Sequence, residues 1–478
     1  MLNPPSGCLK TARGKDACFT LTSLQALSRC IRNRNPRMPE ADFIVAPRWI
    51  IPVEPAGAIL TGHVAVIGSG RIVAIQERAG AAETWPEAEW LERPEHVLLP
   101  GFVNAHTHGP MTLLRGYADD LPLEQWLSEY IWPAEARWAN SEFVRDGADL
   151  AILEMIRSGT TCFHDMYLFP DEICAVAAER GIRAVVSMIV IEAPTAWATE
   201  ADEYINRGLE VHDRYRDHPL VKLSFGPHAP YTVSDEPLQR ISTLANQLDV
   251  PIQIHLHETA DEVQQSVKAT GFRPLERLDK LGMLNPLLNA VHMTELNTDE
   301  IALLAERGVH VVHCPESNMK LASGFCPVAE LMQAGVNVAL GTDGTASNND
   351  LDMLGEMRSA ALLAKAQSGN AAALNAAEAL TVATLNGARA LGMENETGSL
   401  LPGKAADMIC INLASLACQP VHNALSTVVY SATRDQVSDV WVAGRQLLSE
   451  GEFQTADEQE VLARTAGWLS KIHAEASA

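Results

Sequence analysis

Eight short runs of apolar residues alternate with helix-like segments between about residues 98 and 396. Several helix-like segments end in glycine, which commonly closes a helix, as at Gly159 and Gly308. Eight such repeats predict an α/β fold with a closed (β/α)8 TIM barrel. A doubly wound open sheet is the alternative, but no G-x-G-x-x-G follows the first run. The runs are VLLPGFVNAHTH (97–108), TTCFHDM (160–166), IRAVVSMIVIE (182–192), VKLSFGPHAP (221–230), PIQIHLHE (251–258), NAVHMTEL (289–296), VHVVHCPES (309–317) and VNVALGTDG (336–344).

Short β-rich runs separated by turn residues occupy both ends of the chain. Before the barrel, GSG separates HVAVI from RIVAI and indicates a hairpin. After the barrel, DMICIN and VSDVWVAG show the same pattern of short β-rich runs. We predict that residues 41–97 and 397–451 form one small β-sandwich domain. The catalytic barrel then spans residues 98–396, and a C-terminal helix occupies residues 452–478.

The first 37 residues differ in composition from the rest of the chain. They carry seven lysines and arginines against a single acid, Asp16, and lack the long apolar stretch of a signal peptide. We interpret residues 1–37 as a disordered or artefactual extension. A transit peptide is the alternative.

The whole chain is strongly acidic, with a formal net charge of −24 at pH 7. Such a charge repels phosphate backbones and anionic lipids, so we expect neither nucleic acid nor membrane as a partner. No apolar run is long enough to span a bilayer. The nine cysteines are scattered without a C-x-x-C pair, which favours reduced thiols and a cytoplasmic location.

Histidine and aspartate recur where the predicted strands end. A buried imidazole or carboxylate costs free energy unless it is paired or bound to a metal. The ends of parallel barrel strands meet at one rim, and these side chains are ligands that zinc prefers. A lone His-x-His also occurs in surface turns, but the repeated pattern predicts a metal site at the barrel mouth. The residues are His106, His108, His228, His255, His257, His292 and Asp343.

Six motifs resemble those of the amidohydrolase superfamily, and within it the 5′-methylthioadenosine/S-adenosylhomocysteine deaminase family. The resemblance extends from about residue 41 to residue 451. It implies a zinc-dependent hydrolase in which hydroxide attacks purine C6, releasing ammonia and an inosine derivative. The motifs are PGFVNAHTHGPMTLLRGYADDLPLEQWL, FGPHAPYTVS, IHLHETADEV, AVHMTEL, HCPESNMKLASG and GTDGTASNNDLDMLGEMRSAALLAK.

The resemblance implies four ligands that hold one divalent ion per subunit. We expect Zn²⁺, with Fe²⁺ or another divalent ion as the alternative. Relatives with two metals carry a carboxylated lysine at the end of the fourth strand, where this chain reads FGPH and Lys222 stands too early. The implied ligands are His106, His108, His255 and Asp343.

The resemblance also assigns catalytic roles. Asp343 accepts a proton from the attacking water, Glu258 delivers protons to the purine and the leaving amine, and His292 orients the water or stabilises the oxyanion. Strand residues three apart face opposite sides, so Glu258 approaches the metal only if the chain turns after His257. Otherwise Glu258 is an ordinary carboxylate at a helix start. His257 itself is expected to point away from the site.

Five residues are expected to bind the substrate. By resemblance, His228 contacts the purine or ribose and Glu135 accepts hydrogen bonds from the ribose 2′- and 3′-hydroxyls. The alternatives are a buried structural histidine and an ordinary helix carboxylate. Ser347 adds a contact unless it merely caps its loop, and Trp126 and Met188 complete the set.

The 5′ substituent distinguishes two candidate substrates. S-adenosylhomocysteine ends in a carboxylate, which an arginine fork would bind. Residues 184–206 contain no arginine, and Met188 stands where one is expected. Met188, Ile191 and Trp197 offer an apolar wall that suits a methylthio group. We therefore predict 5′-methylthioadenosine over S-adenosylhomocysteine by at least about tenfold in kcat/KM.

The same residues leave one alternative function open and argue against two others. Adenosine, guanine or a triazine is the alternative substrate within the superfamily. A non-catalytic scaffold is disfavoured because all four ligands are present, and the cytidine-deaminase fold is excluded because P-C-x-x-C is absent. The expected partners are a small purine nucleoside and further copies of the chain, in a dimer or tetramer.

Overall fold

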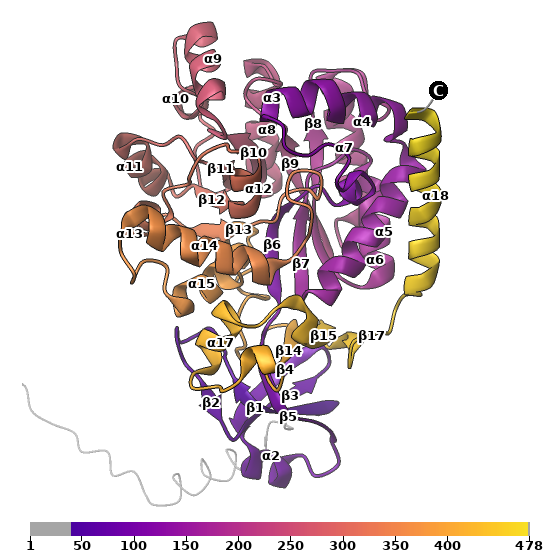
Figure 1. Ribbon diagram of the computed structural model, residues 1–478, viewed down its shortest axis with the longest axis vertical. Coiled ribbons are helices and arrows are strands. Elements are labelled where there is room, and N and C mark those ends of the chain that lie inside the picture. Colours follow the sequence, from indigo (N-terminus) through magenta and orange to yellow (C-terminus); the bar gives the residue numbers. More distant parts are fainter. Residues whose placement is uncertain (1–39, 477–478) are drawn as a thin grey trace, which may run out of the picture. The chain divides into compact units, whose positions relative to one another are not determined.

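The computed structural model describes residues 40–476 of the chain (Figure 1). The extension predicted over residues 1–37 lies outside the described residues, as do the last two residues of the predicted C-terminal helix.

Eight parallel strands form one sheet, and each predicted apolar run contributes one of them. They pair in chain order from first to last. The backbone N–H of Asp343, just after the last strand, donates to the carbonyl of His106 in the first at 3.0 Å, so the (β/α)8 barrel closes. The strands are β6 (Phe102–Thr107), β7 (Thr160–Asp165), β8 (Arg183–Val190), β9 (Val221–Pro227), β10 (Ile252–Leu256), β11 (Leu288–His292), β12 (His310–His313) and β13 (Val338–Leu340).

Helices follow the barrel strands and surround the sheet (Figure 1). The glycines expected to close helices do so, with Gly308 at φ 68° directly after a helix. The helical segments are α2 (Arg78–Thr84), η1 (Gly109–Leu114), α3 (Leu123–Gln125), η2 (Trp126–Ile131), α4 (Trp132–Trp138), α5 (Ser141–Arg157), α6 (Pro170–Arg180), α7 (Ala201–Tyr215), α8 (Asp235–Leu248), α9 (Ala260–Thr270), α10 (Pro274–Lys280), α11 (Thr298–Arg307), α12 (Pro315–Lys320), α13 (Val328–Gln333), α14 (Met353–Ser368), α15 (Ala376–Val382), α16 (Leu385–Ala390), η3 (Leu416–Cys418), α17 (Ala424–Tyr430), η4 (Arg434–Gln436) and α18 (Glu458–Ala476).

Strands from both ends of the chain form a second sheet, as predicted. Its nine strands form one continuous sheet in the order β17-β16-β15-β14-β5-β1-β3-β4, with β2 paired to β1. The two chain ends meet where β14 runs antiparallel to β5. The strands are β1 (Phe43–Ile50), β2 (Leu60–Thr61), β3 (His63–Gly68), β4 (Arg71–Glu77), β5 (Glu89–Pro100), β14 (Met408–Asn412), β15 (Val437–Val442), β16 (Arg445–Ser449) and β17 (Glu452–Phe453).

The run VLLPGFVNAHTH, expected to be one strand, is divided between the two sheets. β5 ends at Pro100 and β6 begins at Phe102, so Gly101 lies between them. A Cβ atom on Gly101 would lie only 2.1 Å from the side chain of Thr161, which excludes any larger residue. The chain therefore passes directly from one sheet into the other through a position that requires glycine.

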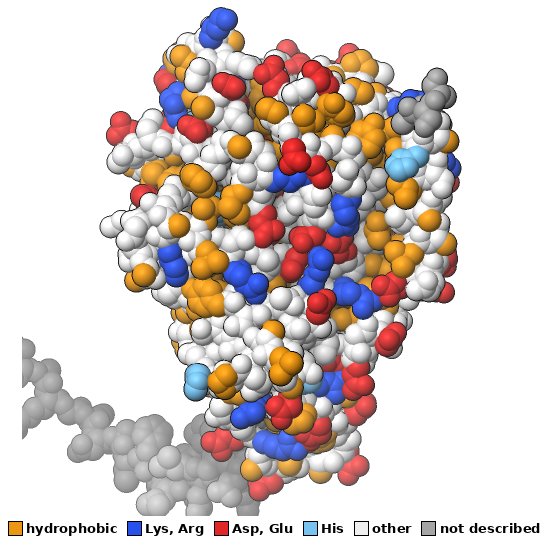
Figure 2. All heavy atoms as spheres, viewed as in Figure 1, with side chains coloured by type: hydrophobic (Ala, Val, Ile, Leu, Met, Phe, Trp, Pro, Cys, Tyr) orange, Lys and Arg blue, Asp and Glu red, His pale blue; other side chains and the backbone are white. Residues whose placement is uncertain are grey.

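The C-terminal helix α18 packs against α5 on the outside of the barrel. The ring of Trp468 lies edge-on to Phe143 at 5.2 Å between centroids, and its Nε1 donates to Asp146. Within residues 40–476, none of the helices could cross a membrane. Figure 2 shows Lys and Arg side chains scattered among Asp and Glu on the visible face, with no single basic surface.

Candidate metal centre and active site

The predicted polar residues gather at the carboxyl ends of the barrel strands. His106 lies in β6, His255 in β10 and His292 at the end of β11, while His108 and Asp343 directly follow their strands. All except His108 are at most 5% exposed. The parallel order of the strands brings residues nearly 240 positions apart in the chain to one place.

The backbone bends sharply where these strands end. His257, His292 and Asp343 have φ angles of 51°, 75° and 63°, in the left-handed region that non-glycine residues rarely adopt. The bend at His257 redirects the chain after β10, so Glu258 faces the same cavity as His255. The turn required for Glu258 to reach the site is therefore present.

The four predicted ligands lie in two overlapping groups of side chains that share His106. Nε2 of His108 lies 3.3 Å from Oδ1 of Asp343, and Nε2 of His106 lies 3.5 Å from the same oxygen. Nε2 of His255 lies 3.2 Å from Nε2 of His106. The nitrogens of His106 and His108 and the carboxylate of Asp343 form a group whose atoms are all within 4.8 Å of one another.

The protonation of these rings suits a cation. Nδ1 of His108 donates to the carbonyl of Met166 and Nδ1 of His255 to that of His228, while Nδ1 of His106 faces Oε1 of Gln253 at 2.8 Å. Each Nε2 therefore presents a lone pair to the centre. Burial lowers the pKa of His106 to about 4, which keeps that ring neutral. Opposed lone pairs 3.2 Å apart repel unless a cation lies between them, so the donor set fits a zinc-type ion.

His292 lies equally close to this centre. Its ring nitrogen forms a second group with those of His106 and His255, again within 4.8 Å. Nδ1 of His292 faces Oδ1 of Asn318 at 2.9 Å, and its Nε2 lies 3.8 Å from Oε2 of Glu258. The position is suitable for the predicted role in orienting water, between the centre and Glu258.

Glu258 is a buried carboxyl group at the edge of the centre. Burial, together with the negative charge of Asp343, raises its pKa to about 8. A carboxyl group with this pKa is protonated at neutral pH and is able to donate a proton.

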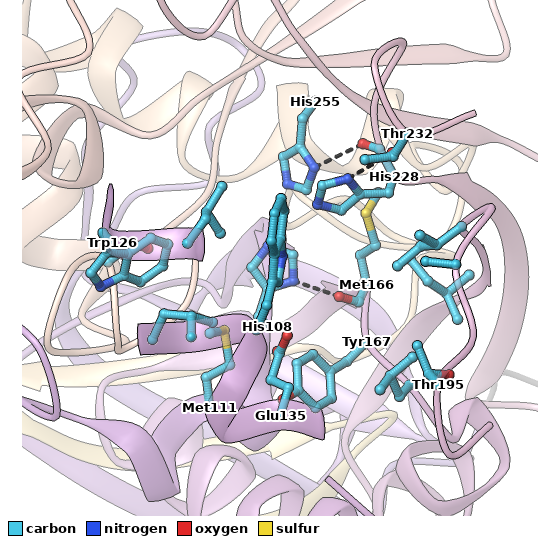
Figure 3. Close-up of a pocket in the computed structure, with 18 of the residues that line it drawn as sticks. His108, Met111, Trp126, Glu135, Met166, Tyr167, Thr195, His228, Thr232 and His255 are labelled. Atoms are coloured by element: carbon cyan, nitrogen blue, oxygen red, sulfur yellow. Dashed lines mark hydrogen bonds between the residues drawn. The ribbon is translucent and has the colours of Figure 1, made fainter. Parts of the chain in front are cut away.

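The centre forms one wall of a cavity of about 380 Å³, a size within the range of small-molecule sites (Figure 3). Four of the residues expected to bind substrate border this cavity: Trp126 of η2, Glu135 of α4, His228 and Ser347. Figure 3 shows Glu135 beside Tyr167 and below His108. Burial raises the pKa of Glu135.

Residues 97–447 of the chain match the amidohydrolase family, and this match covers more than half of the sequence. The chain belongs to the amidohydrolase family.

Named relatives of this amidohydrolase cover nearly its whole length. A protein of Teredinibacter turnerae named 5-methylthioadenosine/S-adenosylhomocysteine deaminase is 49% identical over 434 residues, covering 91% of this chain and 98% of the relative. A protein of Methanopyrus kandleri named 5′-deoxyadenosine deaminase is 42% identical over 415 residues, covering 86% and 95%.

Solved structures agree on the fold of this amidohydrolase. An adenosine deaminase from Xanthomonas campestris, solved with bound zinc, has a TM-score of 0.90 and 51% identity, covering 91% of this chain and 100% of that one. The atrazine chlorohydrolase TrzN of Arthrobacter aurescens, complexed with zinc, has a TM-score of 0.84 at 23% identity, which shows likeness of fold alone.

The prediction that Met188 contacts the substrate is wrong. Side chains alternate along β8, and Ser187 points into the barrel, where its hydroxyl lies 3.1 Å from that of Ser224. Met188 therefore points outward and packs against Gly208 of α7, where a Cβ atom would lie 2.7 Å from that of Met188. The absence of an arginine at position 188 consequently carries no information about the substrate.

Part of the predicted apolar wall remains in this amidohydrolase. Ile191 borders the cavity together with Ile189 and the segment 193–196. Trp197 is not among the residues that border it, and its ring lies against Phe169 at 5.3 Å between centroids.

The hydroxyl of Ser347 forms a hydrogen bond with Asp343. It donates to Oδ2 of Asp343 at 2.7 Å, and Ser317 donates to the same oxygen at 2.6 Å. Ser347 borders the cavity as expected, but its principal partner in this structure is the carboxylate. Sequence reasoning did not single out Ser317, although it lies in the motif HCPESNMK.

Three other histidines and Lys222 lie outside the proposed set of metal ligands. His257 points away from the centre, with Nδ1 donating to the carbonyl of Glu295 and Nε2 accepting from the N–H of Leu275. His313 is buried at the end of β12, and burial lowers its pKa to about 3. His228 donates from Nδ1 to the hydroxyl of Thr232. Lys222 is exposed and does not border the cavity.

Proposed function

We propose that this amidohydrolase is a metal-dependent deaminase that converts 5′-methylthioadenosine, in preference to S-adenosylhomocysteine, to the inosine derivative and ammonia. The observation that carries the proposal is the clustering of His106, His108 and His255 with the carboxylate of Asp343, in two groups that share His106, beside the protonated Glu258 at one wall of the cavity. The names of the relatives, which are deaminases of adenosine derivatives, support the same reaction.

Four residues hold the metal in this proposal: His106, His108, His255 and Asp343. Zinc suits three neutral imidazoles and one carboxylate, and Fe²⁺ or another divalent ion is the alternative. When bound, the ion supplies hydroxide at neutral pH by lowering the pKa of water from about 15.7 towards about 7.

The chain's own groups move the protons. Asp343 accepts a proton as water adds to purine C6, and Ser317 and Ser347 hold that carboxylate in place. Glu258, protonated at neutral pH, donates to the ring nitrogen. It then takes the proton of the hydroxyl bound at C6 and passes it to the amine, which leaves as ammonia when the C6–N bond breaks, and the proton on Asp343 restores Glu258. His292, 3.8 Å from Glu258, orients the water. Burial keeps these groups in low dielectric, where their electrostatic effects are stronger.

The rest of the cavity binds the nucleoside. Glu135 accepts hydrogen bonds from the ribose hydroxyls, and His228 and Trp126 contact the substrate from other sides. Among residues 40–476, no lysine or arginine borders the cavity, whereas Ile189 and Ile191 do. This lining favours a methylthio or deoxy group over the charged tail of S-adenosylhomocysteine.

A panel of adenosine derivatives tests the proposal. The ultraviolet shift on conversion to inosine products gives kcat/KM for 5′-methylthioadenosine, 5′-deoxyadenosine, adenosine and S-adenosylhomocysteine. Guanine and a triazine, assayed by ammonia release, test the alternative substrates. We expect S-adenosylhomocysteine to be poorer than 5′-methylthioadenosine by at least about tenfold. Equal rates for these two would contradict the preference, and the absence of ammonia from every compound would contradict deamination.

We also propose that the enzyme works in the cytoplasm as a homo-oligomer. Six cysteines within the described residues are free and buried, which is consistent with a reducing compartment. Size-exclusion chromatography with light scattering measures whether the chain forms a dimer or a tetramer.

A further inference from the structure

A chain of hydrogen bonds crosses the barrel interior beneath His106. Its members are Gln253 of β10, His164 of β7, Ser224 of β9 and Ser187 of β8. All four side chains are fully buried, and none of them borders the cavity, so they cannot contact a substrate bound there. Through Gln253 they contact His106 instead.

A backbone carbonyl sets the orientation of the Gln253 amide. Nε2 of Gln253 lies 2.7 Å from the carbonyl oxygen of Ala105, and a carbonyl oxygen only accepts hydrogen bonds. The nitrogen must be on this side, so Oε1 is the atom that faces Nδ1 of His106 at 2.8 Å. An amide oxygen also only accepts. His106 therefore carries its proton on Nδ1 and presents the Nε2 lone pair to the centre.

The second hydrogen of the same amide reaches His164. Nε2 of Gln253 lies 2.8 Å from Nδ1 of His164, which must accept. His164 then carries its proton on Nε2 and donates to Ser224 at 2.7 Å, with Ser187 at 3.1 Å. Burial lowers the pKa of His164 to about 3, so this ring stays neutral. Both hydrogens of the Gln253 amide and both ring nitrogens of His164 thus have partners.

We propose that Gln253 is a positioning residue that holds His106 in the tautomer with its proton on Nδ1, and that His164 holds Gln253 in turn. The inference rests on the proposed metal site, because it states how one ligand is prepared for the ion. Groups that orient a metal-bound histidine typically contribute about 10- to 100-fold to metal affinity.

The variant Gln253→Met tests this role, because methionine has a similar length and cannot form the three hydrogen bonds of the amide. Zinc affinity is measured by titrating metal-free protein against a competing chelator. We expect the zinc affinity to fall by about 10- to 100-fold. Ser187→Ala is the matched control: it removes a hydroxyl from the same buried cluster but leaves all three hydrogen bonds of Gln253 intact, so its zinc affinity should stay close to that of the wild type.

A second measurement does not depend on metal or activity. Nitrogen-15 spectra of metal-free protein labelled in histidine distinguish the two tautomers, and the His106 signals are those lost in His106→Asn. We expect a single tautomer, protonated on Nδ1, in the wild type and a mixture in Gln253→Met.

The outcomes separate this inference from the proposed function. If metal-free wild-type His106 is protonated on Nε2, or if Gln253→Met melts earlier yet keeps its tautomer and zinc affinity, Gln253 has only a structural role. A Gln253→Met chain that fails to fold leaves the wild-type spectrum to decide. Failure of the wild type to release ammonia overturns the deaminase, whereas the tautomer of metal-free His106 still decides the inference.

Discussion

At the scale of single residues, the site depends on where protons are held. Burial lowers the pKa of His106 and of His255 and so keeps these rings neutral, whereas Glu258 keeps its proton at neutral pH. Low dielectric accounts for both, because it disfavours the charged form of an acid and of a base alike. The same environment thus suits the proposed metal ligands and the proposed proton donor.

Replacing Glu258 by glutamine removes the proton donor while conserving its shape. We expect kcat for 5′-methylthioadenosine to fall by about 100-fold or more, because general acid catalysis contributes about 10²–10⁴. Metal content, measured by atomic absorption, should be unchanged. The exposed Asp261→Asn serves as control and should leave kcat as it is. A Glu258→Gln enzyme of normal activity would remove Glu258 from the mechanism.

The raised pKa of Glu258 predicts the alkaline limit of activity. The group works as an acid, so its active form is present below a pKa of about 8 and is lost as the pH rises through that value. We expect kcat/KM to be level around neutral pH and to decline above about 8. Rates measured from pH 6 to pH 10 would reveal this limb, and an enzyme whose activity keeps rising to pH 10 would show that Glu258 acts in its ionised form.

At the scale of elements, the turn between β10 and α9 determines where Glu258 points. The carboxyl group of Glu262, in the first turn of α9, accepts from the N–H of His257 at 3.1 Å and from that of Glu258 at 2.6 Å, and burial raises its pKa to about 8. The two oxygens of this carboxyl group therefore hold the left-handed bend at His257. Sequence spacing indicated that a turn was needed, and this pair of bonds is what supplies it.

The variant Glu262→Gln tests the turn. An amide has only one acceptor oxygen, so its NH2 group would face one of the two backbone N–H groups, and two donors cannot form a hydrogen bond. We expect a loss of about 1–3 kcal/mol in the free energy of unfolding, measured with urea. We also expect kcat to fall by about tenfold or more with little change in KM, since Glu258 is misplaced while the cavity remains. Unchanged kcat in a folded variant would show that the turn holds without Glu262.

At the scale of the whole molecule, local patterns predicted the architecture and the gathering of histidines and Asp343 at one rim of the barrel. Strand–helix alternation predicts the barrel, and parallel strands bring His106 and His255 to one rim whatever the exact strand boundaries. The direction of Met188 could not be predicted in this way, because a shift of one residue reverses which side chains of β8 face inward. The bond from Ser317 to Asp343 depends on how separate loops meet, which no local pattern contains.

Removal of the metal should destabilise the whole barrel. A ligand that binds only the native state adds about 4 kcal/mol at a thousand times its Kd. Differential scanning calorimetry should therefore show a lower Tm after chelation and recovery when zinc is added back. His106→Asn is the control, because it should lose most of this response. A Tm that chelation leaves unchanged would contradict a metal shared among β6, β10 and the end of β13.

The hydrogen bond from Asp343 to His106 closes the barrel where two of the proposed ligands lie. During synthesis the first histidine leaves the ribosome more than 200 residues before its aspartate partner. With the proposed ligands, a nascent chain lacks its fourth donor until its eighth strand has joined the first, so we expect full metal affinity only in the closed barrel. A chain truncated before residue 343 should bind the ion far more weakly, however much of its sheet had formed.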